Sequence, residues 1–372
     1  MDILEEILTA LQTESRIMLA TIVSTTGSTP ASALSKMLVK NEGIVSVGTV
    51  GGGCMEGDVL LHAHRLYDSG KAEILTFHLN EDDIGHGLIC GGSLDVLVEP
   101  VNKDDAPVFR NLKAIRDEGD DSLLATVISS DGVVKSKQVF PAKEPERRAG
   151  VMELLKRMNG AGGSSLENSI SEAVAKASRR QETVILAEPE GKLVLEPVPG
   201  APALILFGGG HVSKYVSRAA SMAGFRVTVV DDREKFANAE RFPEAAETLA
   251  MDFLESFNSL TIKPSTYIVI VTRGHRYDEL ILEQVIKNPP RYIGMIGSKR
   301  KVITTFDHLV ARGVSMEALK RVHAPVGIEI GALTAEEISI SIVSELISVR
   351  RGMERSVQHM SGAINLPPGK SE

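Results

Sequence analysis

A glycine-rich turn, FGGGHVS at residues 207–213, is the first segment whose residue types suggest ligand chemistry. It places Gly208 and Gly210 between an expected strand and an expected helix, and Asp231 and Asp232 close the next strand. In such a turn the first glycine permits a tight bend, the second lets a diphosphate approach the backbone, and the helix N-terminus supplies N–H donors. The pattern predicts a nucleotide-binding βαβ unit; the alternative is a turn of the same shape that binds nothing tightly.

Further loops are expected at the same edge of this sheet, because ligands of open α/β sheets bind beyond the carboxyl ends of the strands. The polar residues that follow the expected strands are His211, Asp231, Asp232, Arg273, His275, Ser298 and Lys299. Histidines, basic side chains and acids in one crevice fit an anionic, phosphorylated ligand. We expect Arg233 and Lys301, by contrast, to be solvated loop charges.

A second glycine turn contains the first of the two cysteines. Cys54 follows Gly52 and Gly53 and precedes Glu56, between an expected strand and an expected helix. A thiol near a helix N-terminus has a lowered pKa, which favours the reactive thiolate. Cys54 is therefore a candidate ligand-binding residue, in a glycine-rich turn and not inside an element.

The second cysteine, Cys90, lies in a third glycine turn and is followed by Gly91 and Gly92. Two thiols in glycine turns of one domain are candidates to face one soft metal or a sulfur-rich ligand. The alternative is that both are buried, inert thiols, because free cysteine is among the most buried residue types. Whether the two approach each other depends on the fold.

The elements that position these turns form two patterns. The first 200 residues alternate short strands and helices, which predicts a mixed α/β domain; from residue 203 a strand–helix–strand pattern predicts a Rossmann-like, doubly wound parallel sheet. The proline-rich segment 196–202 marks the boundary. We expect domains at 1–198 and 199–352, and a mobile tail at 353–372. The expected helices are 3–11, 55–68, 104–118, 147–158, 211–223 and 334–351, with one more after each of the strands 266–272 and 291–297. The expected strands are 18–24, 36–40, 44–50, 72–79, 93–100, 203–207, 225–232, 266–272 and 291–297, together with two strand pairs that turn at 131–132 and at 190–191.

Composition excludes several classes of protein. The net charge of −8 gives no global positive field for a nucleic acid backbone. No apolar run approaches the roughly 20 residues that span a bilayer, and the acidic N-terminus is unlike a signal peptide. Two cysteines in 372 residues form no disulfide framework. We expect a soluble, cytoplasmic protein that binds neither nucleic acid nor membrane.

Taken together, these residues resemble the XdhC/CoxI family, the accessory factors of xanthine dehydrogenase and related molybdenum hydroxylases. The segments that carry the resemblance are GSTPASALSKMLV (27–39), GTVGGGCMEGDV (48–59), CGGSLDVLVEP (90–100), LILFGGGHVS (204–213), VVDDREKFANAERFP (229–243), IVIVTRGHRYD (268–278), YIGMIGSKRK (292–301) and PVGIEIGALTAEEISISIVSEL (325–346). They lie in order along both domains, whereas residues 101–200 show little similarity.

The resemblance implies a maturation chaperone without turnover of its own. Such a factor binds the molybdenum cofactor, as molybdopterin or its nucleotide form, protects it, supports its sulfuration with a cysteine desulfurase, and inserts it into an apo molybdenum hydroxylase. It also implies a homodimer, with Cys54 and Cys90 as molybdenum-proximal thiols.

Two segments depart from the family pattern. GGGHVS at 208–213 stands where GAGHVA is more familiar, so that Gly209 and Ser213 replace alanines, and Ala31 stands where an arginine often follows Ser-Thr-Pro. The second departure weakens the case for an anion contact in the polar loop at 27–36, which is either an anion site or a simple turn.

Two other functions remain open. The Rossmann crevice is also compatible with an NAD(P)-dependent oxidoreductase that uses His211 or His275 as the acid/base group. A third possibility is a structural or regulatory module that contacts a partner enzyme without any small ligand.

Overall fold

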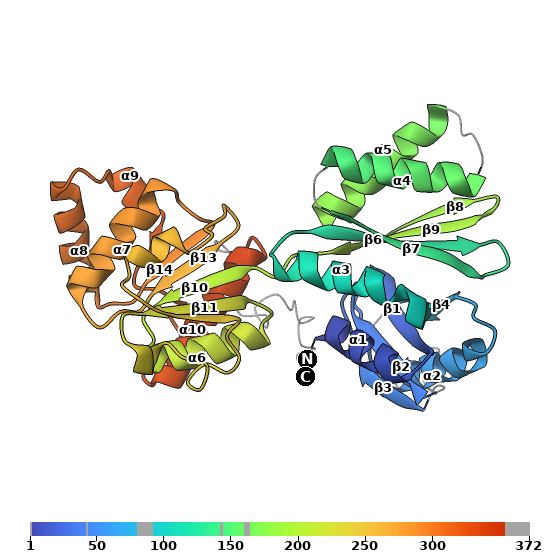
Figure 1. The fold of residues 1–372 in the computed structure, drawn as a ribbon, viewed down its shortest axis with the longest axis horizontal. Helices are drawn as coiled ribbons and strands as arrows, with labels where there is room; N and C mark the ends of the chain where they lie inside the picture. The colour runs from blue at the N-terminus through green and yellow to red at the C-terminus, as the bar shows by residue number, and fades with distance from the viewer. Residues whose placement is uncertain (1, 42–43, 80–91, 142–143, 160–163, 354–372) are drawn as a thin grey trace, which may run out of the picture. The chain divides into compact units, whose positions relative to one another are not determined.

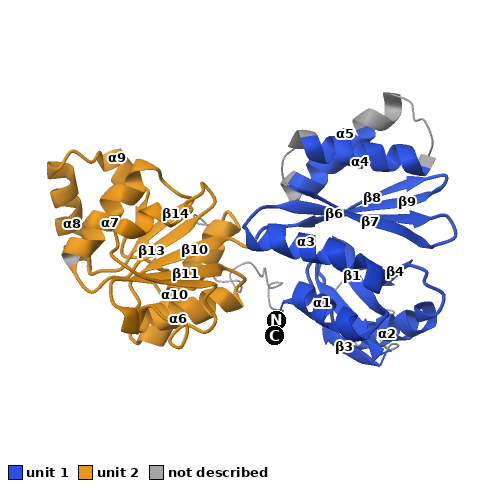
Figure 2. Cartoon of the chain, in the orientation of Figure 1, with its two compact units in different colours: residues 1–200 blue, residues 201–372 orange. Residues whose placement is uncertain are grey.

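The structure is a computed structural model that describes residues 2–41, 44–79, 92–141, 144–159 and 164–353. The chain forms two compact units, residues 1–200 and residues 201–372 (Figures 1 and 2). The tail expected at 353–372 falls almost entirely outside the described residues. Each unit has its own sheets and its own hydrophobic clusters, and each is described separately below.

The first sheet of the N-terminal unit has five antiparallel strands in the order β3-β2-β1-β5-β4. The helix α2 covers one face, where its apolar side chains pack with Met18, Ala20 and Val96 of the sheet. The helices α1 and α3 pack together against the other face. The elements are α1 (Ile3–Thr13), β1 (Arg16–Thr26), β2 (Lys36–Lys40), β3 (Val45–Gly48), α2 (Gly53–Tyr67), β4 (Glu73–His78), β5 (Ser93–Asn102) and α3 (Ala106–Asp117).

A second antiparallel sheet, in the order β7-β6-β9-β8, completes this unit. One of its faces packs on the first sheet through side chains such as Val23, Leu97, Ile128 and Val194. The helices α4 and α5 cover its other face, as Figure 1 shows. The elements are β6 (Ser122–Ser129), β7 (Val134–Pro141), α4 (Glu144–Asn159), α5 (Ser164–Arg180), β8 (Val184–Glu188) and β9 (Gly191–Val198).

Two ion pairs lie within the interface between these two sheets. Lys137 of β7 pairs with Glu99 of β5, and their side chains are 0% and 2% exposed. Lys36 of β2 pairs with Glu196 of β9 at 2.7 Å, and its ammonium also donates to the hydroxyl of Thr21 at 2.8 Å. Each sheet thus contributes one lysine and one glutamate, so the charges balance inside an otherwise apolar interface.

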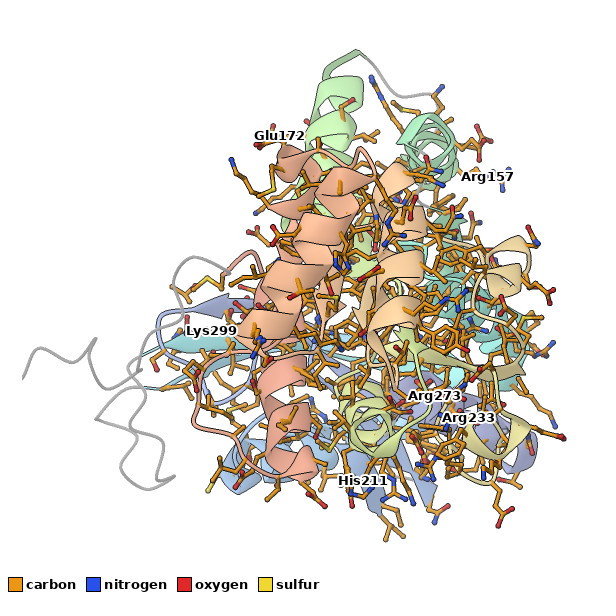
Figure 3. The ribbon with its side chains drawn as sticks, turned by 90° about the vertical axis from the view of Figure 1, so that its left-hand side faces the viewer. Arg157, Glu172, His211, Arg233, Arg273 and Lys299 are labelled. Atoms are coloured by element: carbon orange, nitrogen blue, oxygen red, sulfur yellow. The ribbon has the colours of Figure 1, made fainter. Side chains whose placement is uncertain are left out.

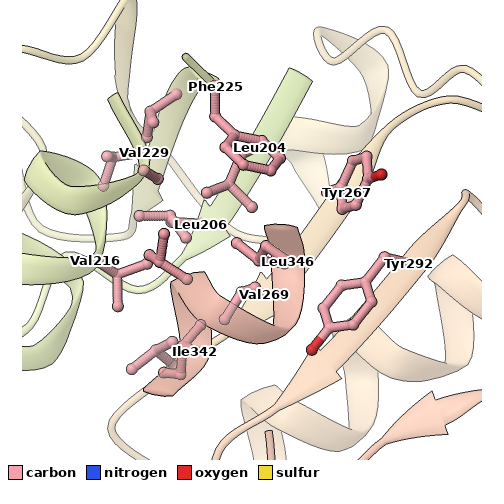
Figure 4. Packing of buried hydrophobic residues seen from close by; sticks show 14 of the residues in the cluster. Leu204, Leu206, Val216, Phe225, Val229, Tyr267, Val269, Tyr292, Ile342 and Leu346 are labelled. Carbon is pink, nitrogen blue, oxygen red and sulfur yellow. The ribbon is translucent and has the colours of Figure 1, made fainter. Parts of the chain in front are cut away.

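The C-terminal unit is a six-stranded parallel sheet in the order β12-β11-β10-β13-β14-β15. The helices α6 and α10 cover one face, and α7 and α8 cover the other. Figure 4 shows the first of these cores, where Val216 of α6 and Ile342 of α10 meet Leu206 and Val269 of the sheet. The elements are β10 (Ala203–Phe207), α6 (His211–Met222), β11 (Arg226–Asp231), β12 (Glu247–Ala250), β13 (Tyr267–Ile270), α7 (His275–Lys287), β14 (Tyr292–Met295), α8 (Lys299–Ala311), α9 (Met316–Leu319), β15 (Val322–His323) and α10 (Ala335–Arg350).

The fold class expected from the sequence is confirmed, including the Thr334–Glu337 capping box of α10. Of the helices and strands given above, four were not predicted: helix α5, the short helix α9 and the short strands β12 and β15. The segment 159–165 was expected to be a surface loop, but Asn159 ends α4 and residues 164–165 begin α5; residues 160–163 lie outside the described part. Ser213, on the buried face of α6, is 0% exposed at the position where small residues allow helix and strand to approach.

Candidate functional site

In the glycine turn after β10, the first two glycines are tightly packed and the third has open space around it. Gly208 has a φ of +108°, and a Cβ there would lie 2.3 Å from the carbonyl oxygen of Val271. A Cβ on Gly209 would lie 2.0 Å from the carbonyl oxygen of Phe236. Around Gly210, which caps the N-terminus of α6, a Cβ would meet no atom within 4 Å. The turn therefore requires glycine at its first two positions and leaves the third accessible.

Asp231 holds this turn from the end of β11. Its carboxylate accepts from the Gly209 N–H at 2.8 Å, and from the backbone N–H (3.1 Å), Nε (2.8 Å) and Nη2 (3.0 Å) of Arg233. Burial opposes ionisation, but these hydrogen bonds outweigh it and lower the pKa of Asp231. With four donors on its two oxygens, the carboxylate is fully used by the protein itself.

Arg241 is a second support of the turn, and sequence reasoning missed it. Its guanidinium donates to the carbonyl oxygens of Gly209 at 2.9 Å and Gly210 at 3.2 Å. It lies in the segment after β11, whose Phe236 ring also carries the Arg233 guanidinium at 3.7 Å from its centroid. No spacing rule identifies such a residue, because its partners are backbone atoms about 30 positions earlier in the chain.

Asp232 and Arg273 form an ion pair between two loops of this edge. Nη1 and Nη2 of Arg273 donate to Oδ1 and Oδ2 of Asp232 at 2.9 and 2.7 Å, a two-pronged arrangement. The hydroxyl of Tyr277 lies 3.4 Å from Oδ2. The side chains of Asp232 and Arg273 are 20% and 42% exposed, so water reaches the pair. Figure 3 shows Arg273 beside Arg233, which lies 3.6 Å from the Asp232 carboxylate.

A third acid, Asp278, lies below the loop that follows β13. Its side chain is fully buried, accepts from the Thr272 hydroxyl at 2.6 Å and pairs with Lys301 of α8. Burial raises the pKa of Asp278 more than Lys301 and Thr272 lower it. The Asp278–Lys301 pair joins the first turn of α7 to the first turn of α8, and the hydrogen bond from Thr272 attaches the β13 loop to it.

The expectation that Arg233 and Lys301 are solvated loop charges is therefore wrong. Their side chains are only 31% and 16% exposed, and each is paired with a nearly buried carboxylate. Both lysine and arginine have long apolar stems that let a charged head reach such a partner beneath the surface.

The other residues expected in the crevice are more dispersed. His211, the exposed first residue of α6, makes an edge contact with the Tyr215 ring, with 5.2 Å between centroids. Ser298 caps α8 by accepting from the Lys301 N–H. Lys299 is exposed, and in Figure 3 it lies apart from Arg233 and Arg273. The backbone of His275 begins α7, but its side chain lies outside the described part of the structure.

The turn that contains Cys54 lies at one edge of the first sheet, and so does Gly92. By strand register, the ends of β1, β3 and β4 and the starts of β2 and β5 all lie at this edge. A Cβ on Gly51 would lie 3.2 Å from Pro30 Cγ, and one on Gly92 would lie 2.4 Å from the carbonyl oxygens of Thr26 and Ser28. Gly51, just before α2, and Gly92, just before β5, thus both pack on the segment at the end of β1 and after it.

Cys54 is an exposed free thiol at this edge. It is the second residue of α2, so the expectation that it lies outside any element is wrong, as is the alternative that it is buried. Gly52 caps α2, Gly53 has open space around its Cβ position, and Glu56 accepts from the Thr49 hydroxyl at 2.5 Å. Cys90 and Gly91 lie outside the described residues.

The polar loop at 27–36 is partly committed to internal contacts. The Thr29 hydroxyl donates to the Ala31 carbonyl oxygen at 2.9 Å, as in a simple turn. The Lys36 ammonium points into the sheet interface toward Glu196. Within the described ranges, no group of three or more His, Cys, Asp or Glu side chains is placed to hold a metal ion. In the same ranges no helix has the length and apolar character to cross a bilayer.

Fold and edge chemistry together define a two-unit protein whose C-terminal unit is a Rossmann domain. The model of the XdhC Rossmann domain matches residues 204–346, and the model of the XdhC and CoxI family matches residues 10–78. The chain belongs to the XdhC/CoxI family and is homologous to xanthine dehydrogenase accessory proteins. The resemblance seen in the sequence is thereby confirmed.

Individual relatives agree with this assignment. "Uncharacterized protein YqeB" of Escherichia coli is 34% identical over 166 residues, which are 43% of this chain and only 30% of that protein. A probable xanthine dehydrogenase subunit of Bacillus subtilis is 24% identical over 92% of this chain and 95% of its own length. A crystal structure titled as a xanthine dehydrogenase from Bacillus halodurans superposes with a TM-score of 0.71 at 25% identity, covering 97% and 99% of the two chains.

Proposed function

We propose that this protein binds the molybdenum cofactor, protects it, supports its sulfuration, and delivers it to a xanthine dehydrogenase-type molybdenum hydroxylase. The proposal rests on family membership and on the names of relatives that are described as xanthine dehydrogenase proteins. Its partners are the apo-hydroxylase, a cysteine desulfurase and a second copy of the chain. A reducing cytoplasm, which keeps Cys54 a free thiol, is the compartment that suits this work.

The observation that carries the proposal is the exposed thiol of Cys54 at the first turn of α2. A soft sulfur atom suits a soft metal or a sulfur-rich ligand. The open backbone at Gly53 and the uncapped N-terminus of α2 lie beside it and suit an anionic group. The chemistry of this edge therefore fits the cofactor: Cys54 would hold the metal and the backbone would hold the anion. When bound, the cofactor would receive the sulfido ligand that the cysteine desulfurase supplies.

The Rossmann edge offers a second anion site of a different kind. Gly210 is open, α6 begins there without a side-chain cap, and two arginines lie in the loops beside it. These features suit the phosphates of a nucleotide, either the nucleotide form of the cofactor or NAD(P).

The deciding experiment measures what the protein carries. The chain is purified anaerobically from cells that make the cofactor, and bound molybdenum and pterin are assayed. Both are expected in the wild type, and both are expected to fall in Cys54→Ser and Cys90→Ser. Asp58→Asn, an exposed change on the same helix α2, is the matched control.

The melting temperature separates a binding role from a structural one. It is expected to change by no more than a few degrees in the Cys54→Ser variant, because that side chain is exposed. Wild-type protein that carries neither molybdenum nor pterin, even after anaerobic loading, contradicts the proposal.

An NAD(P)-dependent oxidoreductase is the second candidate, favoured by the open Gly210 at the switch point between β10 and β13. It requires nicotinamide nucleotide binding that is lost in Gly210→Val. Absence of NAD(P)H binding at millimolar concentration argues against it. Capture of the apo-hydroxylase by ligand-free protein would instead favour a purely regulatory module.

A further inference from the structure

The Arg273–Asp232 ion pair spans the end of the central strand of the Rossmann sheet. Strand β10 lies between β11 and β13 in the sheet. Asp232 follows β11 and Arg273 lies in the loop after β13. Because the three strands are parallel, their carboxyl ends lie at one edge. A bond between the two outer loops therefore crosses the glycine turn that follows β10.

The two acids at the end of β11 differ in how many hydrogen bonds their carboxylates already accept. The Asp231 oxygens accept four donors from the turn and from Arg233. The Asp232 oxygens accept the two prongs of Arg273 and a long contact from Tyr277, and Nε of Arg233, which is hydrogen-bonded to Asp231, lies 3.6 Å from Oδ1. Asp231 is thus a support of the turn, whereas the two short hydrogen bonds of Asp232 both come from the partly exposed Arg273.

A carboxylate and a phosphate present the same pair of oxygens to a guanidinium. Arg273 now uses both prongs on Asp232, directly beside a turn whose open Gly210 and helix N-terminus suit a phosphate. We propose that Asp232 occupies, in the ligand-free protein, the place of a ligand phosphate on Arg273, and that a nucleotide diphosphate displaces it. This inference deepens the proposed nucleotide site and rests on it.

Because the Arg273–Asp232 pair is partly exposed, replacing Asp232 with a phosphate on Arg273 costs little free energy. Water already reaches Arg273 and Asp232, which are 42% and 20% exposed. Exposed ion pairs contribute little, so breaking this one lowers the apparent affinity for a phosphate ligand by only about two- to fivefold. The buried Asp278–Lys301 pair keeps the β13 loop in place while Arg273 turns.

The test uses inorganic pyrophosphate as the probe and isothermal titration calorimetry on the full chain. Asp232→Asn removes the competing carboxylate charge and is expected to bind pyrophosphate about two- to fivefold more tightly than the wild type. Arg273→Gln removes the guanidinium and is expected to bind about 10- to 100-fold more weakly. The double variant is expected to match Arg273→Gln, because the remaining neighbouring guanidinium, that of Arg233, is already hydrogen-bonded to Asp231.

Glu234→Gln is the matched control. It removes one negative charge two residues from Asp232, on an exposed side chain, and is expected to leave affinity near the wild-type value. An equal gain in Glu234→Gln and Asp232→Asn would show a general charge effect and overturn the proposal. So would unchanged affinity in Asp232→Asn, or pyrophosphate binding by neither protein.

Failure of this proposal is distinguishable from failure of the proposed function. Molybdenum and pterin that still copurify with the wild type leave the carrier function standing even if Asp232→Asn changes nothing. A wild type that carries no cofactor but shows the expected pyrophosphate pattern retains the exchange at Arg273 and loses the carrier function.

Discussion

The Lys137–Glu99 ion pair between the two N-terminal sheets is sealed from water, whereas the Arg273–Asp232 pair at the edge of the Rossmann sheet is open to it. Lys137 and Glu99 are 0% and 2% exposed; Arg273 and Asp232 are 42% and 20% exposed. All four side chains are paired, so pairing alone does not separate the two regions. What separates them is whether another partner can reach the charges.

The difference bears on how charged residues are interpreted. A sealed pair holds two sheets in one relative position, and loss of either partner leaves a charge without solvent or counter-ion. An open pair can be exchanged for a ligand at small cost. The sealed pair is therefore a structural feature of the sheet interface, whereas the open pair at the Rossmann edge is accessible to a ligand.

The largest effect is expected from Lys137→Met, which leaves Glu99 buried without its partner. Removing one partner of a buried pair costs about 3–5 kcal/mol of the free energy of unfolding. Urea denaturation measures this loss. The double variant Lys137→Met/Glu99→Met is expected to recover most of the lost free energy of unfolding, since no unpaired charge remains. If Lys137→Met were as stable as the wild type, the distinction between the buried pair and the exposed pair would be wrong.

A smaller effect is expected at the glycine turn, where one position is closed and another open. Gly208→Ala forces a side chain into positive φ and against the Val271 carbonyl oxygen, and is expected to cost about 1–3 kcal/mol. Gly210→Ala, at a φ of −68° with open space, is expected to change stability by less than about 0.5 kcal/mol. Thermal denaturation measures both, and equal losses would contradict this distinction.

The pH dependence of stability is expected to differ between the two acids Asp278 and Asp231. The pKa of Asp278 is raised above 3.8, so its charged form destabilises the fold at neutral pH and this cost disappears as pH falls through the raised value. The pKa of Asp231 is lowered below 3.8, so its stabilisation is complete above 3.8 and is lost as pH falls through the lowered value.

The free energy of unfolding is measured for the wild type, Asp278→Asn and Asp231→Asn at pH values above and below 3.8. The value for each variant is subtracted from that of the wild type to give the contribution of each acid. As pH falls, the first difference is expected to move in favour of the wild type and the second against it. Two differences that change in the same direction would show that one of the two assignments is wrong.

Only a small effect on stability is expected from Asp232→Asn at the open pair. Because exposed ion pairs contribute about 0.2–1 kcal/mol, the free energy of unfolding should fall by less than about 1 kcal/mol, and by still less at high salt. Urea denaturation at two salt concentrations tests this. A loss of unfolding free energy as large as that of Lys137→Met would contradict the distinction between the exposed Arg273–Asp232 pair and the buried Lys137–Glu99 pair.

Local patterns predicted most elements of the fold. The alternation of apolar strands and amphipathic helices after residue 203 was sufficient for the parallel sheet, and Thr334 with Glu337 marked the start of α10. Helix α5 was missed because its neighbouring glycines and serines at 159–165 suggested a loop. Strands β12 and β15 have four and two residues and lack a periodic signal of their own.

The order of strands and helices along the chain predicted which loops lie at the same edge of the sheet, but it did not predict the contacts between their side chains. The positions of Gly208, Gly210 and Asp231 followed from one βαβ pattern, but their hydrogen-bond partners did not. The pairing of Lys301 with Asp278 joins helices α8 and α7 across the packed fold. Such pairs depend on tertiary distances, which no local spacing contains.

The pairing of β1 with β5 has a consequence for synthesis on the ribosome. Arg16 meets Asn102 across this pair, 86 residues later in the chain. At about 5–20 residues per second, roughly 4–17 s pass between the translation of the two. During that time β1, whose residues 17–23 are all buried in the finished fold, has one unpaired edge. The interval is when a nascent chain is most exposed to association with its neighbours, and a folding chaperone would act on it then.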